Sequence, residues 1–395
     1  MIQRIYLDNA ATTKMDPMVL DAMLPYMQEE YGNASSLHYA GLDNRVVVDR
    51  SQAKLANFLG CSKSEVYFTS GATESDNMAI FGVVEAIKSS NKDVDSKLHV
   101  ITTKIEHDAI LEPCHELEKQ GVEVTYLLPD KNGMIDVATL KEAIRPETVL
   151  VSIMYINNEI GTILPITQFG ELISELNKTR ETKIYFHTDA TQAINFVNCN
   201  VADLKVDLLS MSGHKIYGPK GVGAIYIRQN TPFKPLVFGG HQQANIRPGT
   251  YNVPGIVGLT AAIDLLGNES KRSQINQSLI ELRDCIINRV LTTIDGAILT
   301  GGMEERSPNN ASFVFDGAEG EDIVLMLSER GIALSTGSAC SAGSLDPSHV
   351  LLAIGVPSEL AHSSLRVSLS KYNTQEEIDI FLTELITAVT KLRSL

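Results

Sequence analysis

The chain has 395 residues, of which 44% are hydrophobic, and this is enough to bury more than one core. With 48 acidic and 33 basic side chains its formal net charge is -15, which argues against nucleic acid or an anionic membrane as a partner. The N-terminus carries no long apolar segment, and no run of about twenty apolar residues follows, so we expect a cytoplasmic protein with no membrane association.

The first two thirds of the chain alternate short segments rich in β-branched and aromatic residues with longer amphipathic stretches. This alternation predicts an α/β sheet with helices on both faces, including helices at 109–120 and 167–179. Segments such as VLVSIMY are apolar on both faces, as buried parallel strands are. The expected strands cover 66–69, 100–103, 122–127, 149–155, 184–187, 208–211 and 224–227. They predict an open, doubly wound, mainly parallel seven-stranded sheet.

After Leu266 the sequence becomes polar, and a long helical pattern follows to about Leu291. We therefore predict a large domain at 15–262 and a smaller α+β domain made of 1–14 and 263–395. The smaller domain is expected to contain strands at 311–315, 332–335 and 364–369 and an amphipathic C-terminal helix.

A run of small residues, Gly71-Ala72-Thr73, joins the first of these strands to an apparent helix. Such a turn presents free backbone N–H groups and the positive end of the helix dipole, which together suit a phosphate. The alternative is an ordinary threonine N-cap. Neither a G-x-G-x-x-G nor a P-loop pattern occurs, so dinucleotide and nucleoside-triphosphate sites are not indicated.

Other polar side chains follow successive strands. Asp189 ends IYFHTDA, where it could face a pyridinium nitrogen or simply cap a helix. His107 could stack on an aromatic cofactor and exchange protons, or pack at a helix start. Lys215, in SGHKIYGPKG, could be a nucleophilic amine or part of a surface turn.

These side chains share one predicted location, the carboxyl ends of neighbouring strands. A single cofactor there could contact all of them. Pyridoxal phosphate needs a lysine, an acid for its ring nitrogen and a helix N-terminus for its phosphate. The candidates are Thr73, His107, Asn158, Asp189, Gln192 and Lys215.

Seven motifs resemble those of the cysteine desulfurases of the nitrogenase and iron-sulfur-assembly type, within the class-V aminotransferases. They are YLDNAATT, FTSGATESDN, NNEIGT, HTDATQA, SGHKIYGPKGVGA, STGSACSAGSLDPSHVL and AHSSLRVSLSKYNTQEEID. The resemblance implies the fold type I of pyridoxal-phosphate-dependent transferases. It also implies that Lys215 carries the cofactor, that Asp189 faces its ring nitrogen and that His107 stacks on the ring. Further cofactor contacts are expected from Ala72, Thr73, Asn158, Gln192, Ser212 and His214.

The same resemblance implies that Thr250 reaches the phosphate of a neighbouring subunit, and hence a homodimer. This chain has Arg-Pro-Gly-Thr around Thr250 where the family usually has Arg-Ser-Gly-Thr. Arg366 is expected to bind the substrate carboxylate with its planar fork, although an interdomain ion pair is the alternative. Asn33 is expected to add a second carboxylate contact.

The 5 cysteines are scattered without a C-x-x-C pair, which argues against a zinc or redox site. Cys340 lies among small residues that give it little to pack against, and the resemblance makes it the nucleophile that takes sulfur from L-cysteine as a persulfide and leaves L-alanine. Cys61, Cys114, Cys199 and Cys285 are expected to be structural. The sulfur would pass to an acceptor such as an iron-sulfur scaffold protein. The alternatives are an aminotransferase or selenocysteine lyase on the same fold, or a catalytically idle binding partner.

Overall fold

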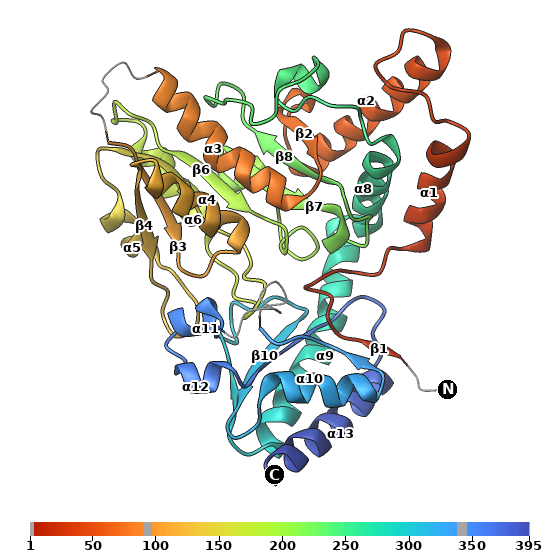
Figure 1. The fold of residues 1–395 in the computed structure, drawn as a ribbon, viewed down its shortest axis with the longest axis vertical. Coiled ribbons are helices and arrows are strands. Elements are labelled where there is room, and N and C mark those ends of the chain that lie inside the picture. The colour runs from red at the N-terminus through yellow and green to blue at the C-terminus, as the bar shows by residue number, and fades with distance from the viewer. Residues whose placement is uncertain (1–3, 91–96, 338–345, 395) are drawn as a thin grey trace.

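A seven-stranded sheet with helices on both faces forms the larger part of the structure, a computed structural model that describes residues 4–90, 97–337 and 346–394 (Figure 1). Six of its strands run parallel, and the remaining one, β8, runs antiparallel to both of its neighbours. In spatial order the strands are β2 (Val66–Thr69), β8 (Gly223–Ile227), β7 (Leu208–Ser212), β6 (Tyr185–Asp189), β5 (Thr148–Ser152), β3 (His99–Thr103) and β4 (Glu123–Leu127).

The seven predicted strands are confirmed, with small differences in their bounds. β5 ends at Ser152 although the sequence predicted it to Tyr155. The chain stays beside β6 beyond that point, because Ile153 N donates to His187 O and Tyr155 N to Asp189 O. Thus the backbone remains paired where the regular ladder has ended.

Neighbouring residues of β3 and of β7 face different cores. Val100 and Leu208 pack with α3 (Ala72–Ser90) and α4 (Asp108–Lys119) on one face of the sheet. Ile101 and Leu209 belong to the core of the opposite face. That face is covered by α1 (Pro17–Gln28), α2 (Tyr39–Leu59), α6 (Ile166–Leu176) and α8 (Val253–Leu266), with α5 (Val137–Ala143) and α7 (Val201–Leu204) nearby. Burial of both faces explains the continuous apolar strands.

The smaller part lies below the sheet in Figure 1 and contains both chain ends. Its antiparallel sheet has the order β12 (Ser364–Ser368), β10 (Asn310–Phe315), β9 (Ala297–Leu299). The N-terminal β1 (Ile5–Tyr6) pairs in parallel with β11 (Ile332–Ala333). β11 is shorter than predicted, because Ser335 forms an isolated bridge with Arg366 instead of continuing the strand.

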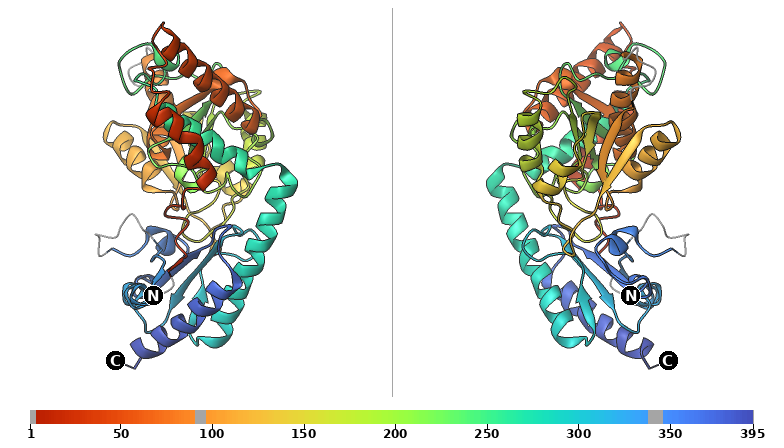
Figure 2. Two further views of the ribbon diagram at one scale, coloured as in Figure 1. Left: turned by 90° about the vertical axis from the view of Figure 1, so that its right-hand side faces the viewer. Right: turned by 90° about the vertical axis from the view of Figure 1, so that its left-hand side faces the viewer.

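Helices complete the smaller part. The long helix α9 (Glu269–Thr293) runs from beside the large sheet down along the small one (Figure 2). The others are α10 (Gly320–Glu329), α11 (His349–Ala353), α12 (Ser358–Ala361) and α13 (Gln375–Leu392). None of the helices in the described part of the chain combines the length and apolar character that a membrane crossing requires. The division into domains at 15–262 remains a prediction.

Candidate active site

A cavity of about 580 Å³ lies at the carboxyl ends of the parallel strands. It is lined both by the large sheet and by residues of the smaller part, such as His349. The structure brings ten of the predicted site residues together in its wall: Ala72, Thr73, His107, Asn158, Asp189, Gln192, Ser212, His214, Lys215 and Arg366. The shared edge of a parallel sheet explains why residues far apart in sequence meet here.

Lys215 follows β7 in the short 3-10 helix η2 (Gly213–Lys215). Its Nζ donates hydrogen bonds to the carbonyl oxygens of Ala10 and, at 2.8 Å, Ala11. Gln192 Nε2 also donates to Ala10 O, at 3.0 Å. The N-terminal segment therefore positions the amine, and the sequence reasoning missed this role although it singled out the YLDNAATT motif.

Asp189 ends β6 and is buried, and its Oδ1 accepts a hydrogen bond from Thr191 N at 2.8 Å. The residues that follow it form turns, so it caps no helix. Asp76 of α3 lies in the same cavity wall, fully buried, and among the described residues neither carboxyl oxygen has a hydrogen-bond partner. Burial, reinforced by Asp189, raises the pKa of Asp76 well above its usual range. Burial therefore favours the protonated, neutral form of Asp76.

His187 belongs to β6, two residues before Asp189, and lies close to Asp76. Its Nδ1 and Nε2 are each 2.9 Å from a serine hydroxyl, those of Ser152 and Ser210. Burial lowers the pKa of His187 to about 3. The imidazole is neutral, so its 3.7 Å approach to Asp76 is not an ion pair.

The N-terminus of α3 supplies the expected phosphate position. α3 begins at Ala72, so Thr73 stands in its first turn and is not the N-cap. His214 Nδ1 lies 3.2 Å from Thr12 Oγ1. Burial, followed by the charges of Lys215 and Lys220, lowers the pKa of His214 to about 4. His214 can thus contribute a hydrogen bond here but not a charge.

His107 packs at a helix start, as one of the two readings predicted, and it also lines the cavity, while stacking on a cofactor stays a prediction. Its Nδ1 accepts a hydrogen bond from Ala109 N at 3.0 Å, which makes it the N-cap of α4 and fixes the ring. The preceding Glu106 is buried and accepts hydrogen bonds from Thr103 Oγ1 at 2.8 Å and from Met154 N at 3.0 Å. Burial raises the pKa of Glu106 to about 8.

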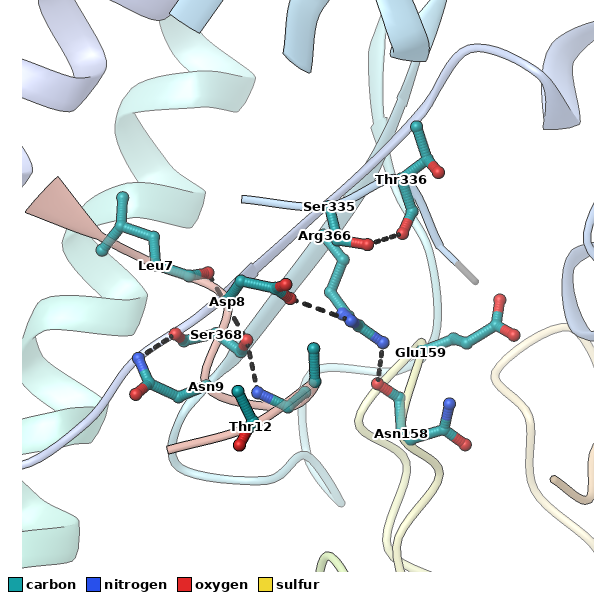
Figure 3. A network of polar contacts seen from close by, with 12 residues as sticks. Leu7, Asp8, Asn9, Thr12, Asn158, Glu159, Ser335, Thr336, Arg366 and Ser368 are labelled. Carbon is teal, nitrogen blue, oxygen red and sulfur yellow. Dashed lines mark hydrogen bonds and ion pairs between the residues drawn. The ribbon is translucent and has the colours of Figure 1, made fainter. Parts of the chain in front are cut away.

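Arg366 of β12 is only 2% exposed and joins the two parts of the molecule (Figure 3). Its Nη1 donates to Asn158 O at 3.0 Å and to Gly337 O at 3.1 Å, and its Nη2 donates to Asp8 Oδ1 at 3.0 Å. Arg366 thus forms an ion pair, but with Asp8 of the same predicted smaller domain and not between domains, and it also lines the cavity.

Two predicted residues are not in this wall. Asn33 is exposed, and its Oδ1 accepts a hydrogen bond from Ser35 N. Thr250 is also exposed, but Asn252, two residues further on, donates to the carbonyl oxygen of Gly221, which lines the cavity. The roles of Asn33 and Thr250 remain predictions.

Cys340 lies outside the described residues. Of the other cysteines, Cys114 and Cys199 are buried, and burial raises the pKa of each of these thiols to about 12. Burial has the same effect on Cys61. These three thiols are therefore poor nucleophiles, because the thiolate is the reactive form.

The cavity fits pyridoxal phosphate in size and in chemistry. Its volume lies within the roughly 300–1,000 Å³ typical of small-molecule sites. Its wall holds the carboxyl group of Asp189, a primary amine and a helix N-terminus beside serine and threonine hydroxyls. Thr191 Oγ1, in the same wall, is buried without a hydrogen-bond partner in the described part of the chain, and a bound group could supply one.

Known proteins share both the sequence and the fold. The model of the family described as "Aminotransferase class-V" matches residues 5–381. "Cysteine desulfurase IscS" of Dictyoglomus turgidum is 47% identical over 395 residues, which cover 100% of this chain and 97% of the relative. "Cysteine desulfurase" of Homo sapiens is 41% identical over 398 residues, covering 100% of this chain and 84% of the human protein.

Two solved structures extend the comparison. The structure titled "NIFS-LIKE PROTEIN" has a TM-score of 0.89 at 36% identity and covers 98% of this chain and 100% of its own. "SspA in complex with cysteine" has a TM-score of 0.79 at 36% identity and covers 94% of this chain and 100% of its own. Both the large sheet and the smaller part are therefore shared with these structures.

Proposed function

The chain belongs to the class-V aminotransferase family, and we propose that it is a cysteine desulfurase that converts L-cysteine to L-alanine and passes the sulfur to an acceptor. Its cofactor is pyridoxal phosphate. The observation that carries the proposal is the single cavity in which Lys215, Asp189 and His107 meet beside the N-terminus of α3.

Pyridoxal phosphate, when bound, supplies an electron sink that allows the C–S bond of a bound amino acid to break. Lys215 would hold the cofactor, and the carbonyl oxygens of Ala10 and Ala11 keep its amine directed at the cavity. Asp189, at the end of β6 in the cavity wall, would keep the ring nitrogen protonated. His107, fixed as the cap of α4, would stack on the ring and exchange protons.

The phosphate would be held by the backbone N–H groups of Ala72 and Thr73 and by Ser212 and His214. Gln192 and Asn158 would make the remaining cofactor contacts. Because His214 is neutral, the helix N-terminus and Lys220 would balance the phosphate charge.

Arg366 would bind the carboxylate of L-cysteine from the side of the smaller part. Cys340 would attack the substrate sulfur as a thiolate, so that an S–S bond forms while the C–S bond breaks, and would then carry the sulfur as a persulfide. An acceptor protein, such as an iron-sulfur scaffold, would remove that sulfur.

We further propose a homodimer. Large apolar side chains are exposed at the start of α2 and just before it, among them Tyr31, Leu37 and Tyr39, each 81% exposed or more. Phe238 is equally exposed, and Arg45 of α2 stacks on Tyr251 at 5.8 Å, close to Thr250. Several large exposed apolar side chains of this kind favour contact with a second copy of the chain, and Thr250 would then face the partner's cavity. A cytoplasmic location remains a prediction from the sequence.

The test is the formation of alanine from L-cysteine, with a thiol reductant to discharge the persulfide. We expect many turnovers from the wild type, none from Lys215→Ala, and loss of sulfur transfer with retention of the bound cofactor in Cys340→Ala. Cys285→Ala is the matched control and should keep the wild-type rate. Full activity of Cys340→Ala would refute the sulfur-transfer role.

A further inference from the structure

Asp8 is the only carboxylate hydrogen-bonded to Arg366 among the described residues. The two residues are 358 positions apart in sequence and meet because the N-terminal segment runs beside β12, with Asp8 bridged to Ser368. Figure 3 shows the Asp8 carboxyl group beside the guanidinium, on the side opposite to Asn158. The sequence reasoning assigned no role to Asp8.

The hydrogen bonds of Arg366 leave part of its guanidinium available. Arginine has five N–H donors, and Nη1 uses two of them on the carbonyl oxygens of Asn158 and Gly337. Nη2 uses one on Asp8. Nε is buried without a partner in the part of the chain described. One N–H of Nη2 and the N–H of Nε therefore remain for another acceptor.

The ion pair with Arg366 stabilises the charge of Asp8 only in part. Burial raises its pKa despite the opposing effects of Arg366 and Lys215, so the pairing does not fully offset the desolvation of Asp8. Its negative charge also lies next to the place where a substrate carboxylate would reach Arg366. Two carboxylates that share one guanidinium repel each other.

We propose that Asp8 is a positioning residue that aims Arg366 through the Nη2 hydrogen bond and, by its charge, weakens the binding of the substrate and product carboxylates. This proposal rests on the proposed desulfurase function, in which L-alanine must leave for the next L-cysteine to enter. The same N-terminal segment accepts hydrogen bonds from Lys215 at Ala10 and Ala11. One segment therefore positions both the amine and the arginine that would bind the substrate carboxylate.

The decisive variant is Asp8→Asn, which keeps an oxygen acceptor for Nη2 and removes the charge. We expect the KM for L-cysteine and the inhibition constant of L-alanine, measured by sulfide release from the holoenzyme, each to fall about tenfold. Inhibition by ethylamine, which is alanine without its carboxylate, should change less than about twofold, because the charge of Asp8 has no carboxylate to repel there.

Further variants separate charge from position. Asp8→Ala removes the acceptor as well, so the KM for L-cysteine should rise above that of Asp8→Asn, whereas Asp8→Glu should restore the wild-type KM. Asp16→Asn is the matched control: Asp16 also belongs to the N-terminal region and forms a largely buried ion pair, but with Lys371 at 2.8 Å. Because no hydrogen bond or ion pair joins Asp16 to Arg366 among the described residues, its KM and inhibition constants should match those of the wild type.

An unchanged or raised KM in Asp8→Asn would overturn the proposal. Parallel changes for alanine and ethylamine would also overturn it, since they would indicate a purely structural role. If neither the wild type nor the variant forms alanine from L-cysteine, the desulfurase function fails. Calorimetric titration of the holoenzymes with L-alanine then still tests Asp8, because tighter binding by Asp8→Asn supports its role and equal or weaker binding refutes it.

Discussion

The pKa of Glu106 makes the stability of the protein depend on pH in a predictable way. Burial raises this pKa from the ordinary 4.5 to about 8, although hydrogen bonds from Met154 and Thr103 oppose the shift. Between these two values the folded protein keeps a proton that the unfolded chain has lost. The contribution of Glu106 to stability is thus fully present below about pH 4.5 and is lost as the pH rises to about 8.

The size of the loss follows from linkage. At about 1.4 kcal/mol for each pH unit, the interval between 4.5 and about 8 corresponds to at most about 5 kcal/mol of unfolding free energy. In E106Q the side chain stays neutral, so this part of the pH dependence should disappear. The amide also brings a donor toward Met154 N, which lowers stability by about 1–3 kcal/mol at every pH.

The assay is urea denaturation of the wild type and E106Q from pH 5 to pH 9 at constant ionic strength. We expect the difference in unfolding free energy between the two proteins to shift in favour of E106Q as the pH rises. E142Q, at an exposed position of α5, is the control and should follow the wild type. If the difference in unfolding free energy between E106Q and the wild type stays constant from pH 5 to pH 9, the proposed effect of Glu106 on stability is refuted.

Three further predictions concern the cofactor, the loop beside it and the dimer. Asp189→Asn should still accept the hydrogen bond from Thr191 N and bind the cofactor, but a neutral amide cannot keep the ring nitrogen protonated. Alanine formation should then fall at least about a hundredfold, and a near-wild-type rate would contradict the role. Asn310→Ala removes a 2.9 Å hydrogen bond to Glu159 O and an acceptor of the buried Arg306, so urea denaturation should show a loss of about 3 kcal/mol; a loss below about 1 kcal/mol would show that these bonds matter little. Leu37→Asp should dissociate the dimer in sedimentation experiments, whereas Leu325→Asp, on the exposed side of α10, should not.

The sequence predicted most of the large sheet because each strand carries a local signal. Strands buried on both faces are continuously apolar, and this pattern marked several of the seven, such as the one predicted at 149–155. It also predicted that Asp189 and Lys215 would meet, because parallel strands place their carboxyl ends along one edge. The weakest element was β11, where pairing with β1 involves only two residues and leaves little periodicity to detect.

The sequence by itself thus determined the α/β architecture and the set of residues at the strand ends. Only the tertiary structure decided how these residues are charged and held. Asp76 favours its neutral form because packing of α3 against the sheet removes it from water next to Asp189. Arg366 is hydrogen-bonded to the carboxylate of Asp8, which lies 358 residues earlier in the sequence. Desolvation and long-range pairing depend on which surfaces the folded chain brings together, and no local pattern in the sequence records them.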